Sequence, residues 1–431
     1  MDAELTNRIR SHWSRTQALV AAGRYAEAAI SAGHAADACR ELARRNPAVM
    51  VDLATITHEL GLLHARNAEW DAAEPAMREA LAAFRPLARA DPDTFTISVA
   101  VSLSYLSLYQ AELGRAEDAL ATAREAAVMY RRLARENPDL DWDFASSLSD
   151  LGNRLMDVGR SPEALPPAQE ALAIRRRLAR GDRSAVPDLA ASLNNIGNLL
   201  RELGRFDDAL APSREAVAIR RPLAQADPGE YLHLLAGSLS NLGNVLAPLG
   251  HRREAVSVTE EGVAAYRRLA VADPSALRPE LARALSNLGL RRWEAGQVAQ
   301  ALAPAEESLR IRQDLTAAHP ALHEADLSAS LNNLSLILRD LDQLGRARTA
   351  AEQAVEIRSR LSQAVPAGYR HHLADSLLNL ALILARLDQP DEALAKAKAA
   401  EQIYRQLAET DPVAFGPGLQ TVLRVLASIR K

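Results

Sequence analysis

The sequence predicts an all-α protein, a right-handed α-solenoid (superhelix) of about nine helix-turn-helix repeats closed by a single C-terminal helix. Three observations predict this fold class. A motif recurs every 45 or 46 residues, apolar residues within each copy follow helical spacing, and helix-breaking residues fall at fixed places in nearly every copy. Repeats of this length contact mainly their neighbours, so one elongated core can extend along all 431 residues.

The clearest copy of the motif is Leu189–Gly204, which reads LAASLNNIGNLLRELG. The other copies are Phe144–Gly159, Leu234–Gly250, Leu281–Gly296, Leu327–Asp342 and Leu373–Asp388. We take Gly197 as the reference position and call it the marker. Its equivalents are Thr16, Gly61, Ser107, Gly152, Gly243, Gly289, Ser335, Ala381 and Ala427. The constant step between markers indicates a repeat array.

Each repeat is predicted to hold two helices. In the fifth, Pro187 and Asp188 suit the first turn of a helix, and Gly204 suits its end. The apolar stripe between them is Leu189, Leu193, Ile196, Leu200 and Leu203. A second helix is expected from about Asp207 to Ala226, with a late start or a kink because Pro212 and Pro222 fall inside it.

Breakers and small residues repeat with the same period. The prolines that follow the second helices are Pro47, Pro92, Pro138, Pro228, Pro274, Pro320, Pro366 and Pro412. One column of small residues is Ala28, Ala73, Ala119, Ala164, Ala209, Ala255, Ala301, Ala347 and Ala393. The other is Ala35, Ala80, Ala126, Ala171, Ala216, Gly262, Ser308, Ala354 and Ala400. Small side chains at these positions let two antiparallel helices approach closely.

The ends of the chain differ from the middle. Residues 1–50 are predicted to be an atypical capping repeat, 51–412 the tandem repeats, and 413–431 a C-terminal capping helix. The lone last helix, Leu419 to Lys431, has apolar residues Leu423, Leu426 and Ile429 that could instead meet a partner.

The composition fits a cytoplasmic repeat protein. Hydrophobic residues make up 48% and charged residues 25%, and the net charge of −4 gives no overall attraction to nucleic acid or to an anionic membrane. The N-terminus lacks the apolar core of a signal peptide, and no apolar run is long enough for a membrane span. Because 48 of the 51 basic residues are arginine, a GC-rich bacterial coding history is expected.

No catalytic, cofactor or metal site is predicted. The chain lacks a phosphate-binding glycine loop, a zinc-protease motif and a nucleophile elbow. The histidine pairs His319/His323 and His371/His372 do not have the setting of a metal site, and the single cysteine, Cys39, is expected in the core. The adjacent arginines of the recurring IRR segments (Arg175, Arg176, Arg220, Arg221) are expected on a solvated, salt-bridged face.

The spacing Leu193-x2-Ile196-Gly197-x2-Leu200, with small residues twelve and nineteen positions after the glycine, resembles the tetratricopeptide repeat. The unit here is longer than the usual length of about 34 residues. The phrases LNNIG and LNNLS, followed by a long second helix, look most like the repeats of kinesin light chains and their bacterial relatives.

This resemblance implies that the first helices line a concave face and that asparagines on them hold an extended peptide. One asparagine column lies two positions before the marker: Asn195, Asn241, Asn287, Asn333 and Asn379. A carboxamide offers both a donor and an acceptor, which match a peptide group whatever its side chain. Alternatively, these amides cap or bridge neighbouring helices. Because Glu59, Tyr105 and Asp150 replace asparagine in earlier repeats, a peptide site is expected in the C-terminal half.

Other candidates for the concave face surround the column. They are Asn194, Asn198, Asn244, Asn332, Arg201, Arg339 and Trp293. The two arginines could hold a carboxylate in a bidentate pair, or be ordinary solvated side chains. Trp293 could pack against a ligand or be structural.

The sequence therefore predicts a non-catalytic scaffold that binds an extended peptide or partner segment on its concave, asparagine-lined face. The alternative is a regulatory or sensor subunit acting on a separately encoded effector, such as a nucleotide-switch ATPase or a protease. An enzyme and a nucleic-acid-binding protein are the remaining hypotheses, and neither has support in a motif.

Overall fold

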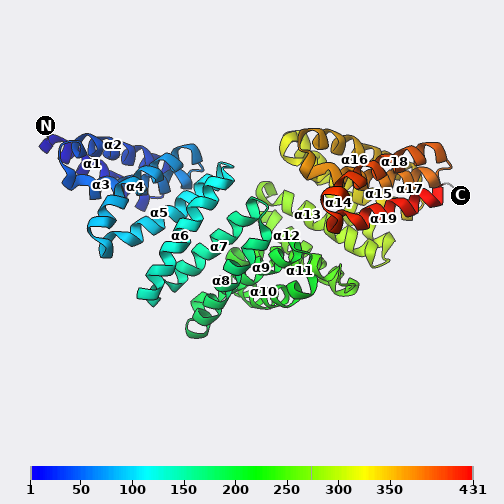
Figure 1. Ribbon diagram of the computed structural model, residues 1–431, viewed down its shortest axis with the longest axis horizontal. Coiled ribbons are helices and arrows are strands. Elements are labelled where there is room, and N and C mark those ends of the chain that lie inside the picture. Colours follow the sequence, from blue (N-terminus) through cyan, green and yellow to red (C-terminus); the bar gives the residue numbers. More distant parts are fainter. Residues whose placement is uncertain (1, 273, 430–431) are drawn as a thin grey trace. The chain divides into compact units, whose positions relative to one another are not determined.

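The computed structural model describes residues 2–272 and 274–429, in which all regular structure is helical (Figure 1). The described residues form nineteen α-helices and three short 3-10 helices. The all-α prediction is confirmed. Helices with odd numbers carry the markers and are called A helices; those with even numbers are called B helices.

The chain forms two compact units, Met1–Arg205 and Phe206–Lys431. The first unit contains α1 (Asp2–Ala21), α2 (Tyr25–Ala43), α3 (Met50–Arg66), α4 (Trp70–Ala90), α5 (Pro92–Glu112), α6 (Ala116–Glu136), α7 (Asp141–Asp157), α8 (Ser161–Gly181) and α9 (Val186–Glu202). Its 3-10 helices are Pro47–Val49, Pro138–Leu140 and Arg183–Ala185. Each helix of this unit packs against the next one along the chain.

The second unit follows the same order. It contains α10 (Phe206–Ala226), α11 (Pro228–Leu246), α12 (Arg252–Ala272), α13 (Pro274–Glu294), α14 (Val298–Ala318), α15 (Pro320–Asp340), α16 (Leu344–Ala364), α17 (Pro366–Arg386), α18 (Pro390–Thr410) and α19 (Pro412–Ile429). Successive helices pack on one another, and successive A helices from α11 to α19 also touch. This is the tandem arrangement of helix pairs that the periodicity predicts.

Both small-residue columns lie where the helices approach most closely. Every alanine of the first column is at most 1% exposed, and so are the alanines and Ser308 of the second. At the marker Gly243, an added Cβ would lie 2.6 Å from Oγ1 of Thr259 on the neighbouring B helix. The period therefore specifies helix contacts through side chains too small to separate the helices.

Turns between A and B helices require a left-handed residue. Six of them use glycine, as at Gly204 with φ of 70°. Ala68, Asp342 and Asp388 adopt φ of 58–60° at the equivalent places. Since the surrounding helices impose this geometry, the turn persists even where the sequence lacks its preferred residue.

Helix α10 differs from its expected form. It begins at Phe206 and continues through Pro212 and Pro222 to Ala226, so the late start does not occur. Ala209 and Ala216 are fully buried along it. Tertiary packing outweighs the local cost of the two prolines.

The last helix packs against the two helices before it. It starts at Pro412, before the expected Leu419, and buries Val422 and Leu426 against α17 and α18. Residues 430 and 431 of the expected helix lie outside the described residues. The limits 1–50, 51–412 and 413–431 remain a prediction. Among the described helices, none has the length and apolar character needed to cross a membrane.

Candidate functional site

The asparagine column lies on the A helices, as predicted. Asn195, Asn241, Asn287 and Asn333 are half-buried, and Asn379 is 4% exposed. These side chains differ in whether the protein itself uses their amides.

Two members of the column bond to the A helix of the preceding repeat. Nδ2 of Asn379 donates to Oγ of Ser335 at 2.6 Å, and Nδ2 of Asn333 donates to Oγ of Ser286 at 3.1 Å. The neighbouring Asn332 accepts a bond from Ser376 at 3.1 Å. At these repeats the amides act as bridges between helices, which is the structural role considered above.

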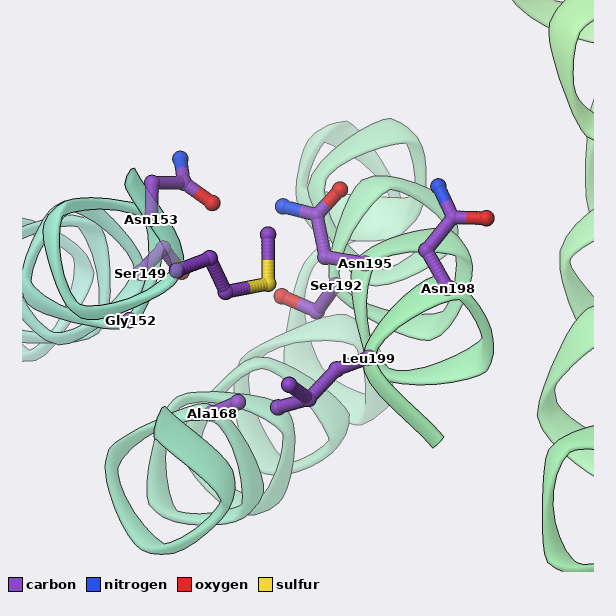
Figure 2. Close-up of a pocket in the computed structure, with 9 residues that line it drawn as sticks. Ser149, Gly152, Asn153, Ala168, Ser192, Asn195, Asn198 and Leu199 are labelled. Atoms are coloured by element: carbon purple, nitrogen blue, oxygen red, sulfur yellow. The ribbon is translucent and has the colours of Figure 1, made fainter. Parts of the chain in front are cut away.

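Other amides form an open cluster in the first unit. Asn195 and Asn198 on α9 and Asn153 on α7 lie around a recess between α7, α8 and α9, with Ser149 and Ser192 beside them (Figure 2). The recess has a cavity of about 50 Å³, enough for a side-chain-sized group and well below a drug-sized pocket. Within the described residues, the side-chain amide of none of these three asparagines has a hydrogen-bond partner.

The remaining amides divide in the same way. In the part of the chain that the structure describes, the side-chain amides of Asn287 and Asn244 have no hydrogen-bond partner, like those of the recess. Asn194 and Asn241 do have interaction partners. The amides that are free to meet a ligand thus belong to a subset of the predicted positions.

Asn153 was missed by the sequence analysis. It lies one position after the marker Gly152, the place that Asn198 and Asn244 occupy in later repeats. Its repeat carries Asp150 in the asparagine column, so the column itself does not point to this repeat. The shared register was the signal that could have identified it.

The two candidate arginines differ in how closely their guanidinium groups contact the rest of the protein. Nη2 of Arg201 lies 3.7 Å from Glu202, its neighbour in sequence. Nε of Arg339 donates to Asp340 at 2.9 Å, and its Nη1 donates to Oδ1 of Asn379 at 3.2 Å. Arg339 is therefore already part of a protein network, and a carboxylate ligand would have to compete for it.

Trp293 belongs to the same network. Its Nε1 donates to Oδ2 of Asp340 at 2.8 Å. Burial alone would raise the pKa of Asp340, but the hydrogen bonds from Arg339 and Trp293 outweigh burial and hold the pKa below its usual value. This bond fits the structural role of Trp293 better than a ligand contact.

The expected solvated face of the IRR segments is only half correct. Arg221 is exposed and pairs with Glu261 at 2.7 Å, but Arg175 and Arg220 are each only 6% exposed. Arg175 donates to Ser192 at 2.8 Å and to Ser146 at 3.1 Å, on the A helices either side of it. Adjacent residues of a helix point about 100° apart, so one arginine of each pair enters the core while the next meets solvent.

Asp150 occupies the asparagine column and accepts a bond from Ser107 at 2.8 Å. Burial raises the pKa of Asp150, and the bond from Ser107 and the charge of Arg154 offset this only in part. Because the pKa of Asp150 is higher in the folded state than in the unfolded state, ionisation of this carboxyl destabilises the fold increasingly as pH rises through these pKa values.

Asp150→Asn removes this ionisation and should therefore increase the free energy of unfolding more at pH 7 than at pH 4.5. Urea denaturation at both pH values measures this, and an equal change at both would contradict it.

Burial shifts the pKa of the cysteine and of the adjacent histidine pair considered in the sequence analysis. Cys39 is fully buried, and burial raises the pKa of its thiol to about 11, as expected of a core residue. The rings of His371 and His372 lie 3.8 Å apart, and burial lowers the pKa of His372 to about 4. Within the described residues, no group of three or more His, Cys, Asp and Glu side chains is placed to hold a metal ion.

Comparison with known proteins identifies related sequences and folds. Profiles described as tetratricopeptide repeat match residues 100–125, 143–221, 281–321, 327–364 and 374–395. No curated protein matches the chain significantly.

Solved structures with a similar fold are distant in sequence. The apo form of RapI is 16% identical with a TM-score of 0.51, covering 72% of this chain and 99% of that chain. A signal transduction ATPase with numerous domains and a tetratricopeptide repeat sensor, from Pyrococcus horikoshii, is 12% identical with a TM-score of 0.53, covering 91% of this chain and 55% of that one. Kinesin light chain repeats from Podospora anserina are 22% identical with a TM-score of 0.40, covering 51% and 96%. At these identities the likeness concerns the fold.

Proposed function

We propose, on the premise that this chain is a tetratricopeptide repeat protein, that it is a non-catalytic protein-interaction scaffold whose A helices hold an extended segment of a partner. The observation that carries the proposal is the amide cluster of Asn153, Asn195 and Asn198 around the recess between α7 and α9 (Figure 2).

The chemistry of the cluster suits a main chain. Each carboxamide can donate to a peptide carbonyl and accept from a peptide N–H, so the three can hold successive peptide groups without reading their side chains. Met156 also lines the recess, and its flexible thioether can adapt to one inserted side chain. In the second unit, Asn287 occupies the repeat position of Asn195 and Asn244 that of Asn198, and neither side-chain amide has a partner among the described residues.

Asn195→Ala should weaken binding of a selected peptide at least fivefold, because a carboxamide that contacts the peptide main chain is removed. The peptide is obtained by selecting a 12-residue phage-displayed library on the intact protein, and its affinity is measured by calorimetry. Asn379→Ala is the contrasting variant. Its amide bonds to Ser335, so it should lower stability while leaving the affinity within twofold.

The same peptide with N-methylated main-chain amides tests what is recognised. It keeps every side chain but loses the peptide N–H donors, so its binding should be lost. Unchanged affinity of either the Asn195→Ala protein or the methylated peptide would refute recognition of a main chain by this cluster.

The regulatory alternative concerns what the bound partner does. In it, the partner is an effector enzyme whose activity changes on binding. It makes the distinct prediction that adding the purified chain alters the turnover of a captured ATPase or protease, which a passive scaffold would leave unchanged.

A further inference from the structure

A row of arginines follows the carboxyl ends of the B helices in the first unit. Arg44, Arg89, Arg135 and Arg180 each lie 28 residues after their marker, one per repeat. Arg89, Arg135 and Arg180 are in the last turns of α4, α6 and α8, and Arg44 follows α2 directly. We call these four residues the arginine row. All four are exposed.

The arginine row differs from the arginines four positions earlier. Those neighbours are used within the protein: Arg40 pairs with Glu79 at 2.7 Å, Arg85 with Glu125 at 2.8 Å and Arg131 with Glu170 at 2.6 Å. Each pair links one B helix to the next. In the described structure, by contrast, no member of the arginine row has an acidic partner or a hydrogen bond from its side chain. The positive charges of the arginine row are therefore available to a ligand.

Stabilisation of the helix dipole does not explain the row. A cation in the last turn stabilises any helix, and every B helix of both units has the same dipole. Yet the equivalent positions in the second unit are Gln225, Val271, Ala317, Gln363 and Glu409. The positive charge is confined to one unit although the structural need is common to both.

Recesses that combine apolar side chains with ion-paired charged ones lie beside the row at the junctions of successive repeats. One, between α4 and α6, has a volume of about 490 Å³ and is lined by Arg89, Val99 and Met129. The next, between α6 and α8, has about 280 Å³ and is lined by Arg135, Phe144 and Ile174. The same repeat positions form both. A matching recess in the second unit, about 440 Å³, has Gln225 in place of the arginine.

We propose that the arginine row and these two recesses form a docking surface for an acidic segment of a partner protein. Its carboxylates pair with the guanidinium groups, and apolar side chains between them enter the recesses. Charge complementarity favours this occupant, because the four arginines of the row have no acidic partner in the described structure. The acids that line the two recesses are each already paired with an arginine, and Met129, Phe144 and Ile174 offer apolar contacts. None of the asparagines of the recess between α7 and α9 takes part, so this surface is separate from the proposed peptide site.

The test uses the full chain and a labelled 20-residue peptide in which leucines are spaced among glutamates. At low salt, Arg89→Gln/Arg135→Gln should weaken its binding at least fivefold, as read by fluorescence anisotropy. Arg253→Gln/Arg310→Gln, which removes two exposed arginines from B helices α12 and α14, is the charge-matched control and should change affinity by less than twofold.

Three further probes separate the contributions. Replacing glutamate by glutamine in the peptide should abolish binding, and replacing leucine by serine should weaken it. A 20-residue oligothymidylate reports on nucleic acid. The proposal is overturned by no binding of the acidic peptide, by equal losses in both double variants, or by row-dependent binding of the oligonucleotide that is tighter than that of the peptide.

Discussion

Replacing Arg358 with alanine should lower the free energy of unfolding by about 3 kcal/mol or more, the usual cost of breaking a buried charged network. Arg360→Ala, two positions along the same helix, should cost less than about 1 kcal/mol because its pairing with Glu324 is at the surface. The two variants remove the same charge and the same number of atoms.

The difference follows from what Arg358 joins. It lies on α16 and is 6% exposed. Its Nε donates to Ser328 on α15 at 3.3 Å, and its Nη1 donates to Ser376 and to the carbonyl of His372 on α17, both at 2.7 Å. Burial lowers its pKa to about 10, so it stays charged at neutral pH. Truncation would leave a cavity and unpaired polar atoms between three helices.

Chemical denaturation followed by circular dichroism gives the two free energies. Because repeat arrays can open locally, amide hydrogen exchange should also be followed, and the loss of protection should centre on α15, α16 and α17. Arg358→Met, which keeps much of the volume, should recover part of the loss. Equal destabilisation by Arg358→Ala and Arg360→Ala would contradict the bridging role.

The fold was predictable because each repeat has small and apolar residues at the same positions. Columns such as Ala28 to Ala393 specify close helix contacts independently in every repeat, so a local deviation, such as a proline inside α10, cannot change the architecture. A pattern that recurs in nine repeats predicts the helices even where one copy contains an unfavourable residue such as proline.

The buried arginines were not predicted from the sequence, because arginine is usually exposed. Arg175, Arg220, Arg312 and Arg358 share one repeat position. In the other repeats that position holds Cys39, Phe84, Tyr130, Tyr266 or Tyr404, all buried. The apolar and aromatic members of the column marked it as interior, and an arginine there can enter the core only because serines of the adjacent A helices accept its hydrogen bonds.

The sequence predicted which helices carry the asparagines, but not which of their amides are hydrogen-bonded within the protein. Asn195 and Asn379 occupy the same repeat position, yet only Asn379 meets a serine at the marker of the preceding repeat. For Asn195 that marker is Gly152, which has no side chain to bond. Whether an amide is free thus depends on a residue 43 or 44 positions earlier in the sequence, so the asparagine column alone does not predict it.

Gly418→Ala tests the last contact of the array, where α19 covers α18. An added Cβ would overlap the ring of Tyr404, lying 2.6 Å from Cζ and closer still to Cε1. The ring cannot move freely, because its hydroxyl donates to Asp375 and the side chain is 6% exposed. Overpacking of this kind costs about 1–3 kcal/mol, more than the 0.5–1 kcal/mol that alanine gains over glycine within a helix.

Gly416→Ala is the matched control, since an added Cβ there meets nothing within 4 Å. It should raise stability by about 0.5–1 kcal/mol, so the two substitutions on one helix are expected to have opposite signs. Hydrogen exchange of the amides of α19 measures the docking directly, and Gly418→Ala should accelerate it while Gly416→Ala should not. Unchanged exchange in Gly418→Ala would mean that Val422 and Leu426 hold α19 in place without this contact, and that the helix tolerates a shift away from Tyr404.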